Sequence, residues 1–180
     1  GLSGLVKVNQ DVTGFAQQKA DIRLGSFSGM EALPSWLTID STTGVLSGTP
    51  DNDAVGDLSV AVVLTDKAGS SAVDNFDITI TNTNDAPDVD STKLTAQTVD
   101  EDNSSWVYNI SGAFSDKDSQ HDSAEKLTFT ATLDNDSALP AWLTLNPETG
   151  VFSGTPENSD VGLITVKVIA TDHYGATVTG

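Results

Sequence analysis

The stretch LPSWLTIDSTTGVLSGTP, from Leu33 to Pro50, returns as LPAWLTLNPETGVFSGTP from Leu139 to Pro156, a shift of 106 residues. The match extends without a gap from 33–72 onto 139–178, and 20 of these 40 positions are identical. Solenoids and propellers repeat every ~20–50 residues, so a much longer period predicts that each copy is a complete domain. The chain is therefore expected to hold two tandem domains.

The repeated block predicts two short strands joined by a turn. Its Leu-Pro start disfavours helix, and the following Trp-Leu-Thr-Ile or Trp-Leu-Thr-Leu alternates apolar and polar residues. Gly44 and Gly150 suit the turn, and Val-Leu-Ser or Val-Phe-Ser forms a second strand that Gly-Thr-Pro closes. Later runs, such as VDNFDITITNTN with Phe76, Ile78 and Ile80 on one face, also predict strands. An all-β fold of sandwich type follows.

The polar segment Asn82–Pro87 predicts the boundary between the domains, because its side chains are short and it ends in proline. We therefore place the first domain at 1–86 and the second at 87–180. Residues 1–32 have no convincing match in the second copy, so the opening strand of the first domain is missing or divergent. By the 106-residue shift, the second copy also lacks the counterpart of the closing strand at Phe76.

The charge balance excludes one class of partner. Eight Lys and Arg against 26 Asp and Glu give a net charge of −18, which repels phosphate backbones, so no nucleic acid is expected. The residues before Ala86 hold 11 acidic and 4 basic side chains, and the rest hold 15 and 4. Simple solubility is an alternative explanation for most of these carboxylates.

Other sequence features also narrow the class of protein. The chain has no cysteine, which fits either the cytosol or an exported protein stabilised in another way, for example by metal. No run approaches the ~20 apolar residues of a membrane span, so no membrane insertion is expected. His121 and His173 lie in polar loops, and no HExxH, G-x-S-x-G or phosphate-binding glycine loop is present. We expect no enzyme.

Several motifs together resemble a known family. FSDKD, LTFTA, LPAWL, TGVFSGTPENSDVG, VKVIATDHYG and FDITITNTNDAP are similar to bacterial cadherin-like repeats related to the dystroglycan-type cadherin and "Putative Ig" families. Such repeats are common in very long surface adhesins, including those of the RTX type. The resemblance covers roughly 33–180. It implies tandem Ig-like (cadherin-like) Greek-key β-sandwich domains, extracellular on a bacterial cell surface, with calcium bound near domain junctions.

The residues themselves also point to calcium, which prefers six to eight hard oxygen ligands at ~2.3–2.6 Å. Asp116 and Asp118 place two carboxylates on one loop, and both face the same way if that loop is extended. In cadherins, a DxD loop, an Asn-Asp linker and an A-x-D-x-x-G strand end meet around calcium. The resemblance therefore assigns the metal ligands to Asn84, Asp85, Asp116, Asp118 and Asp172.

Four further carboxylates are secondary metal candidates. Asp51 and Asp53 follow Gly-Thr-Pro, where cadherins place ligands from the preceding domain. Asp66 is the counterpart of Asp172, but its motif begins with Leu in place of Ala. Glu101, in the expected opening strand of the second domain, could serve a following junction.

The function that these features predict is a calcium-stiffened extender module of a bacterial adhesin, contributing to cell adhesion. Its expected partners are neighbouring domains of the same adhesin and cell-surface polysaccharide, and the module is expected to be a monomer. The alternative is a calcium-dependent carbohydrate-binding module. Trp36 and Trp142 recur inside apolar alternation and are expected in the core, whereas Trp106 and Tyr174 are less constrained.

Overall fold

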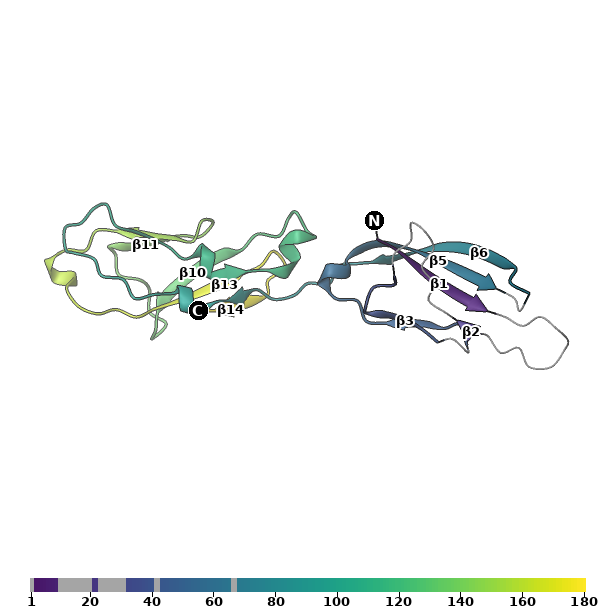
Figure 1. Cartoon of the computed structure of the whole chain (residues 1–180). Coiled ribbons are helices and arrows are strands. Elements are labelled where there is room, and N and C mark those ends of the chain that lie inside the picture. The colour runs from purple at the N-terminus through teal and green to yellow at the C-terminus, as the bar shows by residue number, and fades with distance from the viewer. Residues whose placement is uncertain (1, 10–20, 23–31, 41–42, 66–67) are drawn as a thin grey trace. The chain divides into compact units, whose positions relative to one another are not determined.

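The computed structural model describes residues 2–9, 21–22, 32–40, 43–65 and 68–180 (Figure 1). The chain divides into two compact units, Gly1–Asn82 (unit 1) and Thr83–Gly180 (unit 2). Within the described residues the regular elements are β-strands and short 3-10 helices, which confirms the predicted all-β class. A search of the same residues finds no helix with the length and apolar character needed to span a membrane.

In the part of unit 1 that the structure describes, the strands form one four-stranded sheet and one two-stranded hairpin. The sheet has the order β2-β1-β5-β6, in which β1 runs parallel to β5 and β6 runs antiparallel to it. The hairpin consists of β3 and β4, and the 3-10 helix η1 follows it. The bounds are β1 Leu2–Asn9, β2 Asp21–Ile22, β3 Leu37–Ile39, β4 Leu46–Gly48, η1 Asn52–Ala54, β5 Gly56–Thr65 and β6 Ser71–Ile80.

Unit 2 is built from three small antiparallel sheets, with strand orders β10-β13-β14, β11-β12-β8 and β7-β9. Its strands are β7 Asp88–Val89, β8 Val107–Asn109, β9 Phe114–Ser115, β10 Thr128–Leu133, β11 Leu143–Asn146, β12 Val151–Gly154, β13 Val166–Thr171 and β14 Thr177–Thr179. Its 3-10 helices are η2 Ser91–Lys93, η3 Ser111–Ala113, η4 Lys117–Gln120 and η5 Asn158–Asp160.

The repeated block forms the predicted hairpin in both units, and the geometry explains its glycines. Gly44 and Gly150 have φ of 74° and 65°, a left-handed turn conformation that glycine adopts without a steric penalty. At the closing Gly-Thr-Pro, a Cβ on Gly48 would lie 2.0 Å from the carbonyl oxygen of Trp36. A Cβ on Gly154 would lie 1.9 Å from that of Trp142. Only glycine allows the two strands to approach this closely.

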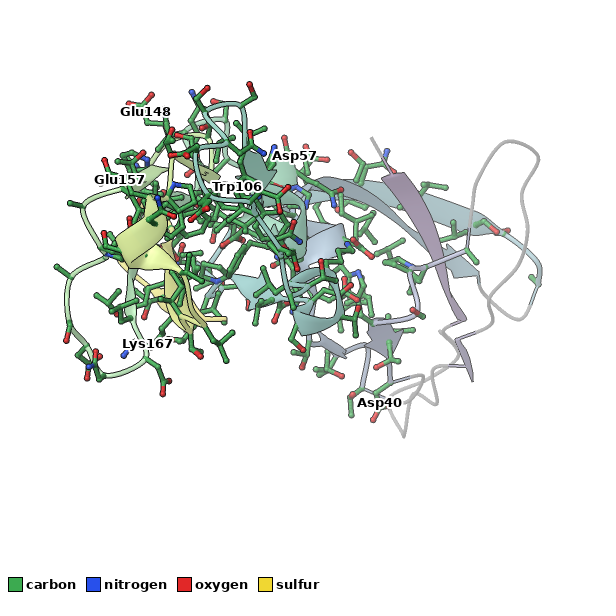
Figure 2. All side chains as sticks on the ribbon, turned by 90° about the vertical axis from the view of Figure 1, so that its left-hand side faces the viewer. Asp40, Asp57, Trp106, Glu148, Glu157 and Lys167 are labelled. Carbon is green, nitrogen blue, oxygen red and sulfur yellow. The ribbon has the colours of Figure 1, made fainter. Side chains whose placement is uncertain are left out.

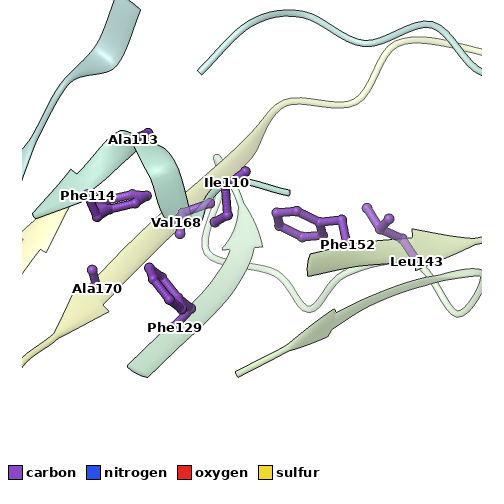
Figure 3. Packing of buried hydrophobic residues seen from close by; sticks show 8 residues of the cluster. All are labelled: Ile110, Ala113, Phe114, Phe129, Leu143, Phe152, Val168 and Ala170. Carbon is purple, nitrogen blue, oxygen red and sulfur yellow. The ribbon is translucent and has the colours of Figure 1, made fainter. Parts of the chain in front are cut away.

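Each unit has its own hydrophobic core. In unit 1 the buried Leu37, Leu58 and Val60 pack together, and Trp36 contributes to their surroundings. In unit 2 the core joins the hairpin to the β10–β13 sheet, and the Phe114 and Phe129 rings meet edge to face at 5.4 Å (Figure 3). Its buried members are Ile110, Ala113, Phe114, Phe129, Leu143, Phe152, Val168 and Ala170. The two segments that align with each other, 33–72 and 139–178, therefore supply core residues to both units.

The strand predictions are confirmed at β6 and fail at the start of unit 2. On β6, Ile78 and Ile80 pack against the unit 1 core as predicted, whereas Phe76, predicted on the same face, is 39% exposed. By contrast, 95–102 (TAQTVDED), expected to be strand-like, forms no strand. Glu101 therefore lies in a turn and not in an opening strand. The turn forms because Asp102 takes a left-handed φ of 62° and donates its N–H to the carbonyl of Pro156 at 2.8 Å.

Candidate metal centre

The segment by which the chain enters unit 2 is bonded to two loops that come later in the sequence. The Asn84 side-chain amide donates to Asp172 Oδ2 at 2.9 Å. The backbone N–H of Asp85 donates to Asp118 Oδ2 at 2.7 Å. These bonds join positions 88 and 33 residues apart. Four of the five predicted ligands are thus already linked in pairs within unit 2.

The fifth predicted ligand, Asp116, lies in the same loop as Asp118. Asp116 is the N-cap of η4, and its Oδ1 accepts the N–H of Asp118 at 2.9 Å. Asp118 is fully buried, with 0% of its surface exposed. An aspartate is almost never fully buried unless it is paired, so the position of Asp118 requires a compensating interaction.

Asp172 closes the β13–β14 turn. Together with Asn84, Asp85, Asp116 and Asp118 it forms the group of residues called the acidic cluster below. Asp172 Oδ1 accepts the backbone N–H groups of Tyr174 at 2.9 Å and Ala176 at 2.7 Å. Gly175 lies between them with φ of 93°, which explains the glycine of the A-x-D-x-x-G motif. Only 5% of Asp172 is exposed. Its other oxygen, Oδ2, faces the Asn84 amide.

The structure adds Glu125, which the sequence reasoning did not single out. Glu125 is 8% exposed, and its Oε1 accepts the N–H of His173 at 3.2 Å. Nearby, the Tyr174 hydroxyl donates to Asp122 Oδ2 at 2.8 Å. Glu125 belongs to the acidic loop SDKDSQHDSAEK, whose charge is visible in the sequence. Which of its carboxylates turn inward depends on contacts with residues about 50 positions later.

The pKa values report crowding of negative charge at Asp116. Burial raises the pKa of Asp116, and the like charges of Asp118, Asp172 and Asp85 raise it further, against the opposing bond from the Asp118 N–H. For Asp172, burial acts to raise the pKa, but the bonds from Asn84 and from the backbone N–H groups of the turn outweigh it, and the pKa is lowered. The surroundings of Asp116 therefore disfavour its charged form.

Two buried carboxylate oxygens are left without a hydrogen-bond partner. These are Asp116 Oδ2 and Glu125 Oε2. Within the described residues, no ion pair involves either side chain. Buried polar atoms are ordinarily hydrogen-bonded, so each of these two oxygens can still accept a bond or coordinate a cation.

A preformed metal cage is absent from the part of the chain that the structure describes. There, no three Asp, Glu or His side chains are arranged so that they could hold a metal ion as they stand. Several carboxylates instead turn one oxygen toward a backbone N–H, as Asp116 and Asp172 do. The oxygens, hard and anionic, suit calcium chemically, but side chains would have to rotate to surround it.

The secondary candidates lie apart from these contacts. Asp51 and Asp53 are exposed, in and beside η1 of unit 1. Asp66 lies outside the described residues. Both oxygens of Glu101 face the side-chain amide of Asn158, at 3.0 and 2.5 Å once that amide is oriented to donate. None of the hydrogen bonds described for the cluster of unit 2 involves Asp51, Asp53 or Glu101.

The tryptophans are occupied in packing. Trp36 and Trp142 pack against the cores of their units, as the repeat predicts. Trp106, labelled in Figure 2, is half-buried. Its ring meets the Trp142 ring edge to face, with centroids 6.4 Å apart. Tyr174 is 62% exposed and has its hydroxyl bonded to Asp122. None of the three tryptophans is therefore a free stacking platform.

Comparisons with known proteins add relatives and a structural likeness. The chain is 33% identical over 143 residues to "Serine-rich adhesin for platelets" of Staphylococcus aureus strain USA300, covering 79% of this chain and 6% of that protein. The corresponding protein of strain MRSA252 matches at the same identity, with 9% of its length covered. The chain thus spans less than a tenth of these relatives.

Among solved structures, the chain is similar to one described as "Protocadherin gammaB7 EC3-6 cis-dimer structure". The TM-score is 0.42 at 16% identity, over 100% of this chain and 49% of that one. A family model described as "Putative Ig domain" matches residues 5–81 and again residues 87–180. The chain therefore belongs to this Ig-like domain family and carries two copies of the domain in tandem.

Proposed function

We propose that the chain is a structural module of a bacterial surface adhesin, located outside the cell, and that unit 2 binds calcium through Asn84, Asp85, Asp116, Asp118 and Asp172. The relatives named as adhesins support the first part of the proposal. The observation that carries the second part is the buried, unpartnered Asp116 Oδ2 beside three other carboxylates whose charges raise the pKa of Asp116.

Calcium would relieve the electrostatic cost of this cluster. Like charges a few ångströms apart repel by several kcal/mol at moderate effective dielectric, and a divalent cation reverses the sign of that interaction. The oxygen atoms of these residues have different roles. One oxygen each of Asp116 and Asp172 holds a loop through backbone N–H groups. This leaves Asp116 Oδ2 for the ion, whereas Asp172 Oδ2 becomes available only when the Asn84 amide that donates to it turns away. Asn84 can present its amide oxygen after a rotation of the side chain.

We add Glu125 to this proposed set of calcium ligands. The bond to Asp122 raises the pKa of the Tyr174 hydroxyl most, and the charges of Glu125 and Asp118 raise it further, so both of these carboxylates lie on the same side of unit 2 as Tyr174. Glu125 Oε2 is buried and has no partner. A side chain with one oxygen fixed to the His173 N–H and the other unsatisfied is well placed to complete the coordination of a cation.

The structural consequence concerns the entry segment. Asn84 and Asp85 lie three and two residues before Pro87, where the chain joins the core of unit 2. An ion held by both these residues and the two loops would reduce the freedom of the segment that connects the units. Calcium would thereby stiffen the module, and it would stabilise the folded form of unit 2 by mass action.

Thermal unfolding of the full chain tests the metal. Extracellular modules bind calcium with Kd of ~10⁻⁴–10⁻³ M, so 10 mM calcium should stabilise unit 2 by about 1.5–2.5 kcal/mol relative to chelator. A shift of roughly 6–20 °C in its Tm is expected. The same concentration of magnesium serves as the ionic control, because magnesium dehydrates reluctantly and prefers a smaller, octahedral site.

Two matched variants locate the effect. Asp118→Asn should remove most of the calcium-dependent shift, whereas Glu148→Gln, at an exposed position in the repeated hairpin, should keep all of it. In parallel, ¹⁵N relaxation at the Asn84 and Asp85 amides should show reduced fast motion with calcium. Equal Tm in chelator and calcium, with unchanged relaxation at these amides, would remove the metal from the proposal and leave the structural role.

A carbohydrate-binding role has less support from the geometry. Sugar rings stack on exposed aromatic faces, and Trp36, Trp106 and Trp142 are instead half-buried against their cores. A glycan array probed with the full chain in calcium tests this alternative. Binding that Tyr174→Ala abolishes would favour it over a spacer, because Tyr174 is the large aromatic side chain that unit 2 leaves most exposed.

A further inference from the structure

Three asparagines of unit 2 share one short sequence pattern. Of the ten asparagines in the chain, Asn103, Asn109 and Asn135 are followed by a residue other than proline and then by serine. Asn-x-Ser is the acceptor pattern for the attachment of sugar to asparagine side chains of exported proteins. The other seven asparagines, including all four of unit 1, lack it. Since so short a pattern recurs by chance, exposure and bonding in the fold must distinguish the three.

The three asparagines also share one side-chain conformation. Their Oδ1 atoms accept the backbone N–H of the serine two residues later, at 3.0 Å for Asn103, 2.9 Å for Asn109 and 3.1 Å for Asn135. A turn closed in this way by an asparagine side chain holds the amide close to the serine. The bond strengthens when the amide oxygen gains negative charge, which happens as the nitrogen loses a proton and attacks. The conformation therefore prepares Nδ2 to act as a nucleophile.

The nucleophilic nitrogen of each of these side chains is free. Among the residues that the structure describes, none accepts a hydrogen bond from Nδ2 of Asn103, Asn109 or Asn135. Asn84, which lacks the pattern, by contrast donates from its Nδ2 to Asp172 at 2.9 Å. The three asparagines with the pattern can therefore present this nitrogen without first breaking a bond within the protein.

Exposure favours Asn103 over Asn109. A transferase has to contact the asparagine, the middle residue and the serine together. Residues 100–105 are all exposed, and none of them is in a strand. At Asn109 the middle residue, Ile110, is instead a core residue that is 3% exposed, and Ser111 is half-buried. The tripeptide that begins at Asn109 can therefore be read only after the core of unit 2 opens.

Bonding favours Asn103 over Asn135. The tripeptide that begins at Asn135 lies in a tight turn, which a backbone hydrogen bond of 2.9 Å closes across 133–137. Its middle residue is also held by an ion pair with Lys167 of β13. Within the described structure, the three residues that begin at Asn103 form hydrogen bonds only inside the segment 100–105. This tripeptide can therefore enter the cleft of an enzyme while the fold stays intact.

From conformation, exposure and bonding together, we propose that Asn103 is the acceptor of an N-linked glycan. The donor is a sugar joined through its C1 carbon to a diphosphate, which is carried by a nucleoside or by a membrane lipid. Nδ2 of Asn103 attacks C1 and forms the N–C1 bond as the bond from C1 to the diphosphate oxygen breaks. The electron pair leaves on that oxygen, and Nδ2 gives one proton to a base of the transferase.

Occupancy is measured on the protein isolated from the surface of the bacterium that makes it. Fragmentation mass spectrometry of its peptides locates any sugar and the asparagine that carries it. We expect sugar on the peptide that contains Asn103, and little or none on the peptides that contain Asn109 and Asn135. Either an unmodified Asn103 or equal occupancy of all three asparagines would overturn the proposal.

Two reactions on the folded, recombinant full chain identify the donor. One uses a soluble bacterial N-glycosyltransferase with UDP-glucose, and the other uses a membrane oligosaccharyltransferase with a lipid-linked oligosaccharide. Sugar at Asn103 in the first reaction assigns a nucleotide donor, and sugar at Asn103 in the second assigns a lipid donor. If neither reaction modifies Asn103, the folded chain is not an acceptor and the proposal is wrong.

Two substitutions at Ser105 confirm that the pattern is what the transferase reads. Ser105→Ala should lose the sugar although Asn103 is intact, whereas Ser105→Thr should keep it, because serine and threonine both complete the pattern. Ser105 is exposed, and circular dichroism checks that both variants keep the fold. Full glycosylation of the Ser105→Ala chain at Asn103 would contradict the proposal. None of these results depends on whether unit 2 binds calcium.

Discussion

The two units share one hairpin but surround the following strand differently. In unit 1, β5 is ten residues long and lies between the parallel β1 and the antiparallel β6. In unit 2, β13 is six residues long and lies between the antiparallel β10 and β14. Half of the 40 aligned positions are identical. The difference therefore arises from the segments that the repeat does not include.

The same contrast applies to the acidic cluster. In unit 2 the DxD loop, the entry segment and the β13–β14 turn meet through hydrogen bonds to Asp118 and Asp172. A shift of 106 residues places Gln10 and Val12 opposite Asp116 and Asp118, so unit 1 lacks the DxD pair in its sequence. Two copies of a repeat can thus share a core while a loop differs, because loops carry few of the packing constraints of the core.

The sharpest way to break the shared hairpin is to substitute its closing glycines. Gly154→Ala drives a Cβ into the Trp142 carbonyl oxygen, and Gly48→Ala does the same at Trp36. Each change should destabilise its own unit by about 3 kcal/mol, since the collision is with backbone that must shift. Calorimetry of the full chain should show one transition lowered in each variant. Gly112→Ala, where a Cβ meets nothing within 4 Å, is the control.

Truncation at equivalent positions separates the two sheet edges. Leu58→Ala removes a side chain that is 3% exposed and should cost roughly 2–4 kcal/mol in unit 1. Ile164→Ala, at the matching position of unit 2, removes one that is 38% exposed and should cost about 1 kcal/mol or less. Urea unfolding measures both values. Equal costs would mean that the Leu58 and Ile164 side chains are equally buried.

A neutral replacement at Asp116 tests the charge crowding that distinguishes unit 2. In chelator, Asp116→Asn should raise the stability of unit 2 slightly, by about 1 kcal/mol or less after solvent screening, because it removes a repelled charge. Its amide oxygen can still accept the Asp118 N–H. In calcium the same variant should be less stable than the original chain. A loss of stability in chelator would show that the charge is not repelled.

The pH dependence should have opposite signs at two carboxylates. The pKa of Asp116 lies above its ordinary 3.8, so the folded state holds this proton more tightly. In chelator, the contribution of the Asp116 proton to the stability of unit 2 is fully present below pH 3.8 and is lost as pH rises through the raised pKa. The pKa of Asp172 is lowered, so its contribution is present above pH 3.8 and is lost as pH falls through the lowered value.

Stability of unit 2 in chelator should therefore increase modestly as pH falls from 7 toward 4 and decrease below that. Melting curves at fixed ionic strength measure the profile. Asp116→Asn should remove the increase and keep the decrease, which assigns each limb to its residue. Under saturating calcium the increase should vanish in the original chain too, because protons and calcium compete for the same oxygens.

Much of the fold could be predicted from the sequence, and the predictions that were wrong or incomplete have physical causes. The hairpin and the apolar face of β6 follow from local alternation and turn residues, which need no distant contact. Segment 95–102 was also expected to be strand-like, yet it forms no strand, and its apolar residues Ala96 and Val99 lie three positions apart and do not alternate with polar ones. Asn84, Asp85, Asp116, Asp118 and Asp172 were found by motif, whereas Glu125 was not, since no motif says which side of a loop is buried.

The sequence by itself determined that there are two copies of one β-domain, where each hairpin turns, and that acidic residues accumulate in the second copy. The two copies follow from the 106-residue repeat, and the other properties depend on side-chain chemistry and on local periods of a few residues. Only the tertiary structure decided that Asp118 is buried, that Glu125 faces His173, and that Ile164 is more exposed than its counterpart Leu58. Such properties depend on which distant segments meet, and a strand's neighbours are set by the whole chain rather than by its own residues.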